Sequence, residues 1–128
     1  MVAQYFLTNA KEILYPSIPS PPIPYALPLK SYTGNYSHPA FPPFTVSTLG
    51  KDLRVTASLD FVALDIVVNH VTGEHWLADV RDLHTNTTIA KSRVEFKVDV
   101  KGAVTELGFE IDAELTAIDE KTWFAKKV

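Results

Sequence analysis

The chain has 128 residues, a length that supports one domain with a real hydrophobic core and leaves no room for a second. Its 46% hydrophobic and 21% charged residues are ordinary for a soluble globular protein, and a formal charge of -3 without a basic cluster argues against nucleic acid as a partner. The chain has no cysteine, which excludes a disulfide framework, a thiolate zinc site and a cysteine nucleophile.

The first fifteen residues predict a short helix. Between residues 3 and 15, apolar side chains recur at a spacing compatible with one helical face, and Pro16 ends the pattern. The stretch from Met1 to Asn9 has neither a basic region nor a sustained apolar run. We therefore expect neither a signal peptide nor a membrane span in this chain.

A proline-rich segment follows, with six prolines in the thirteen residues 16–28. Proline fixes φ and removes an amide donor, so the segment is predicted to be a stiff, polyproline-like strap rather than a helix or a central strand. The apolar residues between the prolines are Ile18, Ile23, Tyr25 and Leu27. They are too apolar for a freely solvated linker, so we expect them to form a contact surface. The alternative is a ligand for a proline-recognition domain.

From residue 29 onward the hydrophobic period changes to two, which is typical of half-buried antiparallel strands. The clearest run is 93–100, whose inward face is predicted to be Val94, Phe96, Val98 and Val100. After a turn at Lys101-Gly102, the next run has Thr105, Leu107, Phe109 and Ile111 on one face. The two runs therefore predict a hairpin.

Similar pairs of runs flank Gly50-Lys51 and Thr72-Gly73. The remaining predicted strands are 31–36, 44–49, 53–57, 61–69, 74–80, a weaker one near 87–91, and 122–126. Antiparallel sheets of about eight strands tend to close and so remove their edges. We therefore predict an all-β fold, an antiparallel up-and-down barrel preceded by a helix and a strap.

No known catalytic motif is present. The serine acyl-enzyme motif Ser-x-x-Lys uses one helical turn to bring a lysine amine to a serine hydroxyl, and no serine here has lysine three positions later. The partner motif Lys-Thr-Gly is also absent, since Lys121-Thr-Trp123 carries a bulky residue in place of glycine. Nucleophile elbows, phosphate loops and His-Glu-x-x-His are missing as well. We predict no catalytic residue and no cofactor.

The histidines are interpreted as structural or solvated side chains. His70 and His75 flank a predicted turn and have acidic neighbours, residue types that can bind a metal ion if they converge. Alternation places His75 on the opposite face from Trp76, so we predict polar hairpin side chains and no metal site. His38 and His84 have no evident base or nucleophile beside them.

The large apolar residues of the predicted strands are Trp76, Trp123, Phe61, Phe96, Phe109 and Phe124. Such residues can line a ligand cavity in an eight-stranded barrel or fill its core, and we favour the core.

Two segments match the N-glycosylation pattern, Asn35-Tyr-Ser37 and Asn86-Thr-Thr88. They favour a eukaryotic secreted parent protein. Because Asn35 lies in a predicted strand, Asn86, in a polar loop, is expected to be the better acceptor.

The segment Tyr32-Thr-Gly-Asn-Tyr-Ser-His-Pro39 is the most distinctive in the chain. It is part of the run 27–39. Together with the ordered segments 49–53, 71–76, 94–96, 102–104 and 122–126, this run resembles the lipocalin-like C-terminal domain of β-lactamase-related, penicillin-binding-protein-like serine hydrolases, especially fungal ones. The resemblance covers roughly residues 22–128. Relatives often have glycine after the aromatic that follows His-Pro, where this chain reads Phe41-Pro-Pro-Phe44, and often arginine where Lys126 stands.

The resemblance implies that residues 1–28 are a helix and a proline-rich linker from a preceding domain, and that residues 29–128 are the lipocalin-like domain. Serine chemistry would then belong to a separate N-terminal domain of the parent protein. The chain is expected to be a non-catalytic accessory domain that packs on this serine-hydrolase domain or mediates homo-oligomerisation. The alternative is a stand-alone lipocalin-like carrier of a small apolar ligand, which displacement of a hydrophobic dye by lipids would favour.

Overall fold

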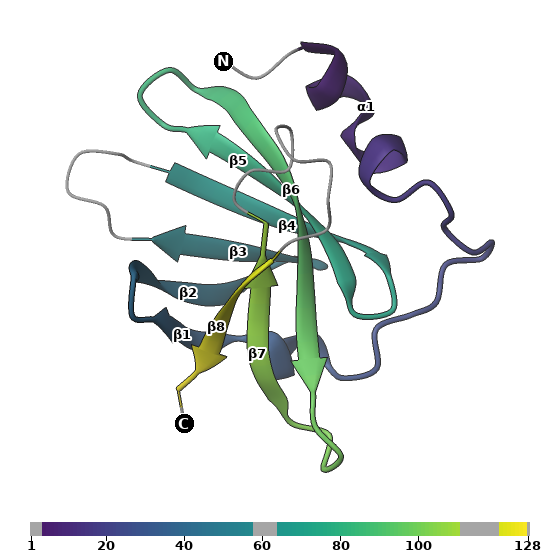
Figure 1. The fold of residues 1–128 in the computed structure, drawn as a ribbon, viewed down its shortest axis with the longest axis vertical. Helices are drawn as coiled ribbons and strands as arrows, with labels where there is room; N and C mark the ends of the chain where they lie inside the picture. The colour runs from purple at the N-terminus through teal and green to yellow at the C-terminus, as the bar shows by residue number, and fades with distance from the viewer. Residues whose placement is uncertain (1–3, 58–63, 111–120, 128) are drawn as a thin grey trace.

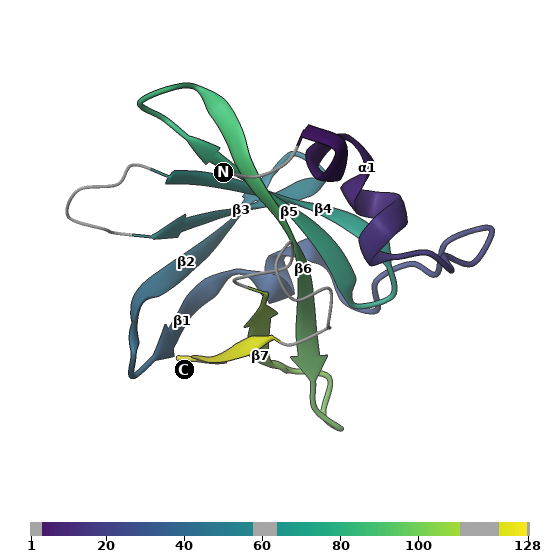
Figure 2. The ribbon, with the colours of Figure 1, turned by 45° about the horizontal axis from the view of Figure 1, so that its top comes forward.

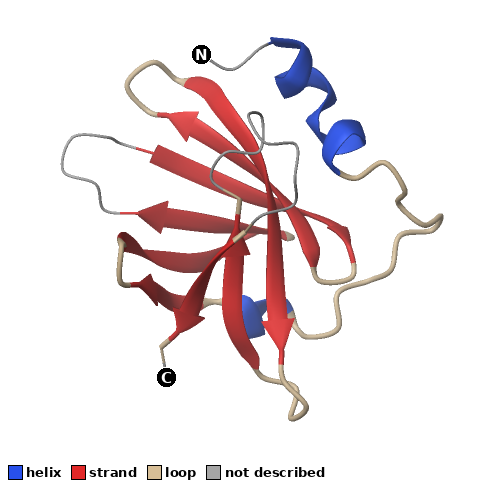
Figure 3. Cartoon of the chain, in the orientation of Figure 1, coloured by secondary structure: helices blue, strands red, loops and turns tan. Residues whose placement is uncertain are grey.

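The computed structural model describes residues 4–57, 64–110 and 121–127, with side chains from residue 8 onward. Its strands form a closed barrel, and the helix lies outside the barrel wall (Figures 1 and 3). The elements are α1 (Gln4–Leu14), the 3-10 helix η1 (Leu29–Tyr32), β1 (Gly34–His38), β2 (Phe41–Leu49), β3 (Asp52–Ala57), β4 (Leu64–Thr72), β5 (His75–Asp82), β6 (Thr87–Val98), β7 (Val104–Phe109) and β8 (Thr122–Lys126).

The barrel is antiparallel and up-and-down. Each strand pairs with the next one along the chain, and β8 closes the barrel by pairing with β1 through Tyr36↔Lys126 and Ser37↔Ala125. The view in Figure 2 shows the same ring of strands with α1 on its outer side. The predicted fold class, an eight-stranded antiparallel barrel after a short helix, is confirmed.

Most predicted strands differ from the structure by a few residues at their ends, and two differences change how the elements are arranged. The runs predicted at 87–91 and 93–100 form the single strand β6, because the residues between them continue to pair with β5. The strand predicted to begin at Ser31 begins at Gly34 instead. Residues 29–32 form a 3-10 turn, in which the Ser31 amide donates to the Pro28 carbonyl at 2.8 Å.

Aromatic side chains fill much of the barrel interior. The fully buried rings are Trp76, Tyr32, Tyr36, Phe96 and Phe124. The Trp76 ring contacts the Phe96 ring at a centroid distance of 6.0 Å, and the Tyr32 ring lies against both. Phe109 is also buried, whereas Phe61 lies outside the described residues. The interpretation of these residues as core therefore holds for Trp76, Phe96, Phe109 and Phe124.

The predicted inward faces of the last hairpin need two corrections. Val100 is fully exposed because β6 ends at Val98. Thr105 is exposed and Val104 is buried in its place, because the register shifts where Val98 pairs with Val104. At this irregularity β7 has one extra residue, Thr105, without a paired residue on β6. The side chain before it therefore faces the side opposite to the one that strict alternation predicts. Ile111 lies outside the described residues.

Trp123 lies on the outer face of the barrel rather than in the core. It pairs with Gly108 on the neighbouring strand, and a Cβ atom added to Gly108 would stand 2.8 Å from the indole ring. The Lys97 ammonium lies 4.0 Å from the centroid of the same ring. Any residue larger than glycine at position 108 would therefore push the indole away from the strand backbone.

Replacing Phe96 by alanine should lower the free energy of unfolding by about 3 to 5 kcal/mol, because a large buried ring leaves a cavity. Val100→Ala is the matched control, since its side chain on the same chain segment is fully exposed and its loss should change stability by less than about 0.5 kcal/mol. Urea denaturation measures both. Equal midpoints for the two variants would contradict the assignment of Phe96 to the core.

Candidate functional site

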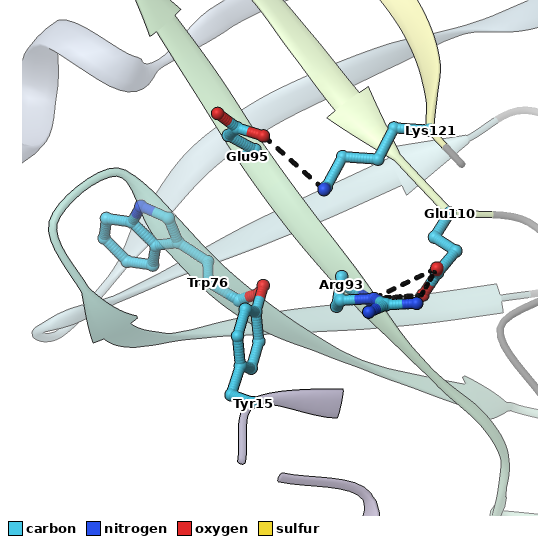
Figure 4. Close-up of polar contacts among 6 residues, drawn as sticks. All are labelled: Tyr15, Trp76, Arg93, Glu95, Glu110 and Lys121. Carbon is cyan, nitrogen blue, oxygen red and sulfur yellow. Dashed lines mark hydrogen bonds and ion pairs between the residues drawn. The ribbon is translucent and has the colours of Figure 1, made fainter. Parts of the chain in front are cut away.

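Helix α1 packs on the barrel of the same chain, and so does the proline-rich strap, which is residues 16–28. Ala10 and Leu14 of α1 are buried against Val71 and Leu77, which project outward from β4 and β5. The Tyr15 hydroxyl donates a hydrogen bond to the Trp76 carbonyl at 2.7 Å, and Figure 4 shows this side chain directed at β5. The end of the helix is thereby fixed to the barrel wall.

The strap is then held by the turn between β4 and β5. The Gly73 amide donates to the Ile23 carbonyl at 2.7 Å, and the Ile23 amide donates to the Thr72 hydroxyl at 2.9 Å. Gly73 has a φ of +56°, a left-handed conformation that glycine adopts without a steric cost. Figure 1 shows this turn lying beside the strap. The strap has few amide donors because of its prolines, and one of them, the Ile23 amide, bonds to this turn.

Glu74, the next residue of the turn, joins the strap to the core. Its carboxylate accepts hydrogen bonds from the Ala26 amide at 3.0 Å and from the Tyr32 hydroxyl at 2.5 Å. The Leu27 amide in turn donates to the Tyr32 oxygen at 3.4 Å. One acidic side chain therefore holds two segments that precede it by more than forty residues.

The four apolar strap residues do not share one environment. Tyr25 and Leu27 are half-buried against the barrel core, and Ile18 packs against the cluster beneath α1. Ile23 is 55% exposed. Three of the four apolar strap residues thus pack on the barrel of the same chain. Contact with a partner stays a prediction, and Ile23 is the residue of the four with the most surface left for it.

Two buried tyrosine hydroxyls support the strap from below. Burial, and then the hydrogen bond to Glu74, raise the pKa of Tyr32 well above its ordinary value. Burial also raises the pKa of Tyr36, whose hydroxyl donates to the Tyr32 carbonyl at 2.7 Å. Both phenols therefore keep their protons to a higher pH than an ordinary tyrosine, and both donate hydrogen bonds.

The histidines near the turn contact aromatic rings. His70 Nε2 lies 2.8 Å from the Gly73 carbonyl, and the His70 ring packs edge-on against Tyr25 and Trp76. The His75 ring instead packs against Tyr15 on the outer face. Within the described residues, no three His, Asp or Glu side chains are grouped as metal ligands.

A cluster of charged side chains on β6 and its neighbours was not predicted from the sequence. The Arg93 guanidinium forms a two-pronged ion pair with the buried Glu110 carboxylate, and Lys121 Nζ lies 3.5 Å from Glu95 (Figure 4). Arg93 is 8% exposed and Glu110 is 1% exposed. In the sequence Arg93, Glu95 and Glu110 occupy outward positions of alternating strands. Lys121 stands just before the last predicted strand, so nothing distinguished these charges from solvated residues.

The two predicted glycosylation sites are both exposed. Asn35 is part of β1, and its side-chain oxygen accepts a hydrogen bond from Thr45. Asn86 lies in the β5–β6 turn with a φ of +55°, and Arg81 donates to its side chain. Their modification stays a prediction.

Sequence comparison finds a family and a longer relative. The family model described as a domain of unknown function, DUF3471, matches residues 19–126. The relative is "Unguisins hydrolase ungD'" of Aspergillus campestris (strain IBT 28561), 50% identical in an alignment 128 residues long that covers 93% of this chain. The chain spans only 22% of the length of that protein.

A solved structure has a similar fold. It is the crystal structure of the C-terminal domain of penicillin binding protein Rv0907, which superimposes with a TM-score of 0.58 at 20% sequence identity. The match covers 86% of this chain and 94% of that one.

Replacing Glu74 by alanine should lower the free energy of unfolding by about 1 to 3 kcal/mol, because the Tyr32 hydroxyl and the Ala26 amide both lose their acceptor. Proteolysis within residues 16–28 should become faster. Glu106→Ala is the control, since the Glu106 carboxylate stands 3.9 Å from the Lys97 ammonium in a partly exposed ion pair that contributes little. Equal cleavage rates in the two variants would show that Glu74 does not hold the strap.

Stability should also fall as the pH rises above about 10, the ordinary pKa of tyrosine. Above that pH the unfolded chain loses its phenolic protons, while folded Tyr32 and Tyr36 keep theirs because burial has raised their pKa. Urea midpoints measured between about pH 8 and pH 11 test this, and Tyr36→Phe should reduce the slope. A midpoint that stays constant above pH 10 would be incompatible with protonated, buried phenols.

Proposed function

The chain belongs to the DUF3471 family, the C-terminal domain of β-lactamase-related and penicillin-binding-protein-like serine hydrolases, and on this premise we propose that it is a non-catalytic accessory domain. Its partner is an N-terminal serine-hydrolase domain of the same protein, on which it packs, or a second copy that it joins. The observation that carries this proposal is the strap, which is fixed to the barrel yet keeps apolar surface exposed.

The exposed part of the helix and strap is suited to a protein contact. Ile13 is 41% exposed on α1 and Ile23 is 55% exposed on the strap, and the prolines of the strap are exposed as well. Hydrogen bonds to the β4–β5 turn already order this segment. A partner that binds it therefore avoids most of the entropic cost of ordering a flexible linker.

The organisation proposed for a longer protein follows from this contact. Residues 1–28 would continue from the catalytic domain, and residues 29–128 would form the accessory barrel. The two Asn-x-Ser/Thr segments, at Asn35 and Asn86, support a secreted parent. Among the described residues, no helix is both long and apolar enough to cross a membrane.

The proposal predicts that changing the exposed strap residue affects the hydrolase domain. In a longer protein that carries this barrel behind a serine-hydrolase domain, Ile23→Asp should separate the thermal unfolding of the two domains and lower the midpoint of the catalytic one, because a charge enters an apolar contact. Val100→Asp is the matched control, since Val100 is an exposed apolar residue that lies in the β6–β7 turn, away from the strap.

Activity provides the second readout of the same experiment. Hydrolysis of a chromogenic β-lactam or ester should be found with the longer protein and not with this chain alone. If Ile23→Asp and Val100→Asp unfold identically to the unmodified protein, and size-exclusion chromatography shows a monomer in each case, the strap is not a contact surface. Serine-dependent hydrolysis by this chain alone would show that it is itself an enzyme.

A further inference from the structure

A recess lies where the strap meets the rim of the barrel. It has a volume of about 320 Å³ and is lined by Tyr25, Lys51, Asp52, Asn69 and His70. These residues come from the strap, the β2–β3 turn, the start of β3 and the end of β4. The volume is at the lower end of the range for small-molecule sites, so an occupant would be a small molecule.

Two opposite charges in this recess have no partner. Lys51 and Asp52 are neighbours in the chain, and within the described residues neither side chain forms an ion pair or a hydrogen bond. The Asn69 amide is likewise without a side-chain partner there. By contrast, Arg54, two residues after Asp52 on β3, pairs with Asp65 at 3.0 Å. The recess therefore presents a cation, an anion and an amide that can all bind a ligand.

Its other wall consists of two fixed rings. The Tyr25 and His70 rings meet edge-on at a centroid distance of 4.9 Å. The contact between His70 Nε2 and the Gly73 carbonyl orients the imidazole, and Tyr25 rests on Trp76 at 5.2 Å. Because both rings are held from behind by the core, the apolar wall is formed before any ligand binds.

We propose that this recess binds a free α-amino acid with an apolar side chain. Such a molecule carries its ammonium and its carboxylate on one carbon, so the adjacent Asp52 and Lys51 can bind both charges. The side chain then packs against Tyr25 and His70, and the Asn69 amide bonds to the carboxylate or the ammonium. This role goes beyond the accessory function and does not depend on a hydrolase partner.

Binding at this site is linked to the strap. Tyr25 belongs to the strap, while the other lining residues belong to the barrel. The site is complete only when the strap is docked, so a bound amino acid stabilises the docked state in proportion to its occupancy. A saturating ligand should therefore slow proteolysis within residues 16–28.

Titration of the ¹⁵N-labelled chain with L-phenylalanine tests the proposal by NMR. The amide signals of Lys51, Asp52 and Asn69 should shift saturably. N-acetyl-L-phenylalanine amide, which has neither charge, should bind at least about tenfold more weakly, because it loses both ion pairs. Lys51→Gln and Asp52→Asn should each weaken binding of L-phenylalanine about two- to fivefold and leave the spectrum otherwise folded.

Lys101→Gln is the matched control, an exposed lysine in the β6–β7 turn outside the recess, and should leave the dissociation constant unchanged. Shifts that do not saturate, or equal affinities for the free and the capped amino acid, would overturn the site. Binding without protection of the strap from protease would overturn its link to the strap. None of these outcomes depends on the hydrolase domain, so they are separate from a failure of the accessory role.

Discussion

Trp76 is the residue on which both the barrel and its attachments depend. Its ring packs against Tyr32 and Phe96 inside the barrel, and against Tyr25 at the barrel end. Its carbonyl accepts the hydrogen bond from Tyr15 that fixes the end of α1. The same hairpin carries the turn that binds the strap. Core packing and strap docking are therefore coupled, because one side chain and its adjacent turn support both.

This coupling changes how the proline-rich segment is understood. A flexible linker would leave two domains free to reorient, since chain entropy favours many arrangements. Here, hydrogen bonds to Thr72, Gly73 and Glu74 order the segment on the barrel, so it presents a fixed surface. The buried rings also bear on the carrier alternative. Tyr36, Phe96 and Trp76 take up space inside the barrel that a ligand would otherwise occupy.

Alternation in the sequence was enough to predict the barrel. In β6, Val94 and Phe96 face inward as predicted, since an antiparallel strand with one buried face must follow a period of two. The alternation failed where the period itself is interrupted. The extra residue at Thr105 moves Val104 into the core, and no local residue type announces the irregularity because it arises from pairing between strands.

The amino-acid sequence by itself determined most of the strands and the all-β barrel, because alternation and turn residues are local properties of the chain. Only the tertiary structure decided where the strap lies and what holds it. Glu74 and Tyr32 are 42 residues apart, and Tyr15 and Trp76 are 61 apart. The buried ion pair of Arg93 and Glu110 likewise joins residues from two different strands, or their ends, that are distant in the sequence. Such contacts depend on barrel closure, which brings distant residues together in ways that no local pattern specifies.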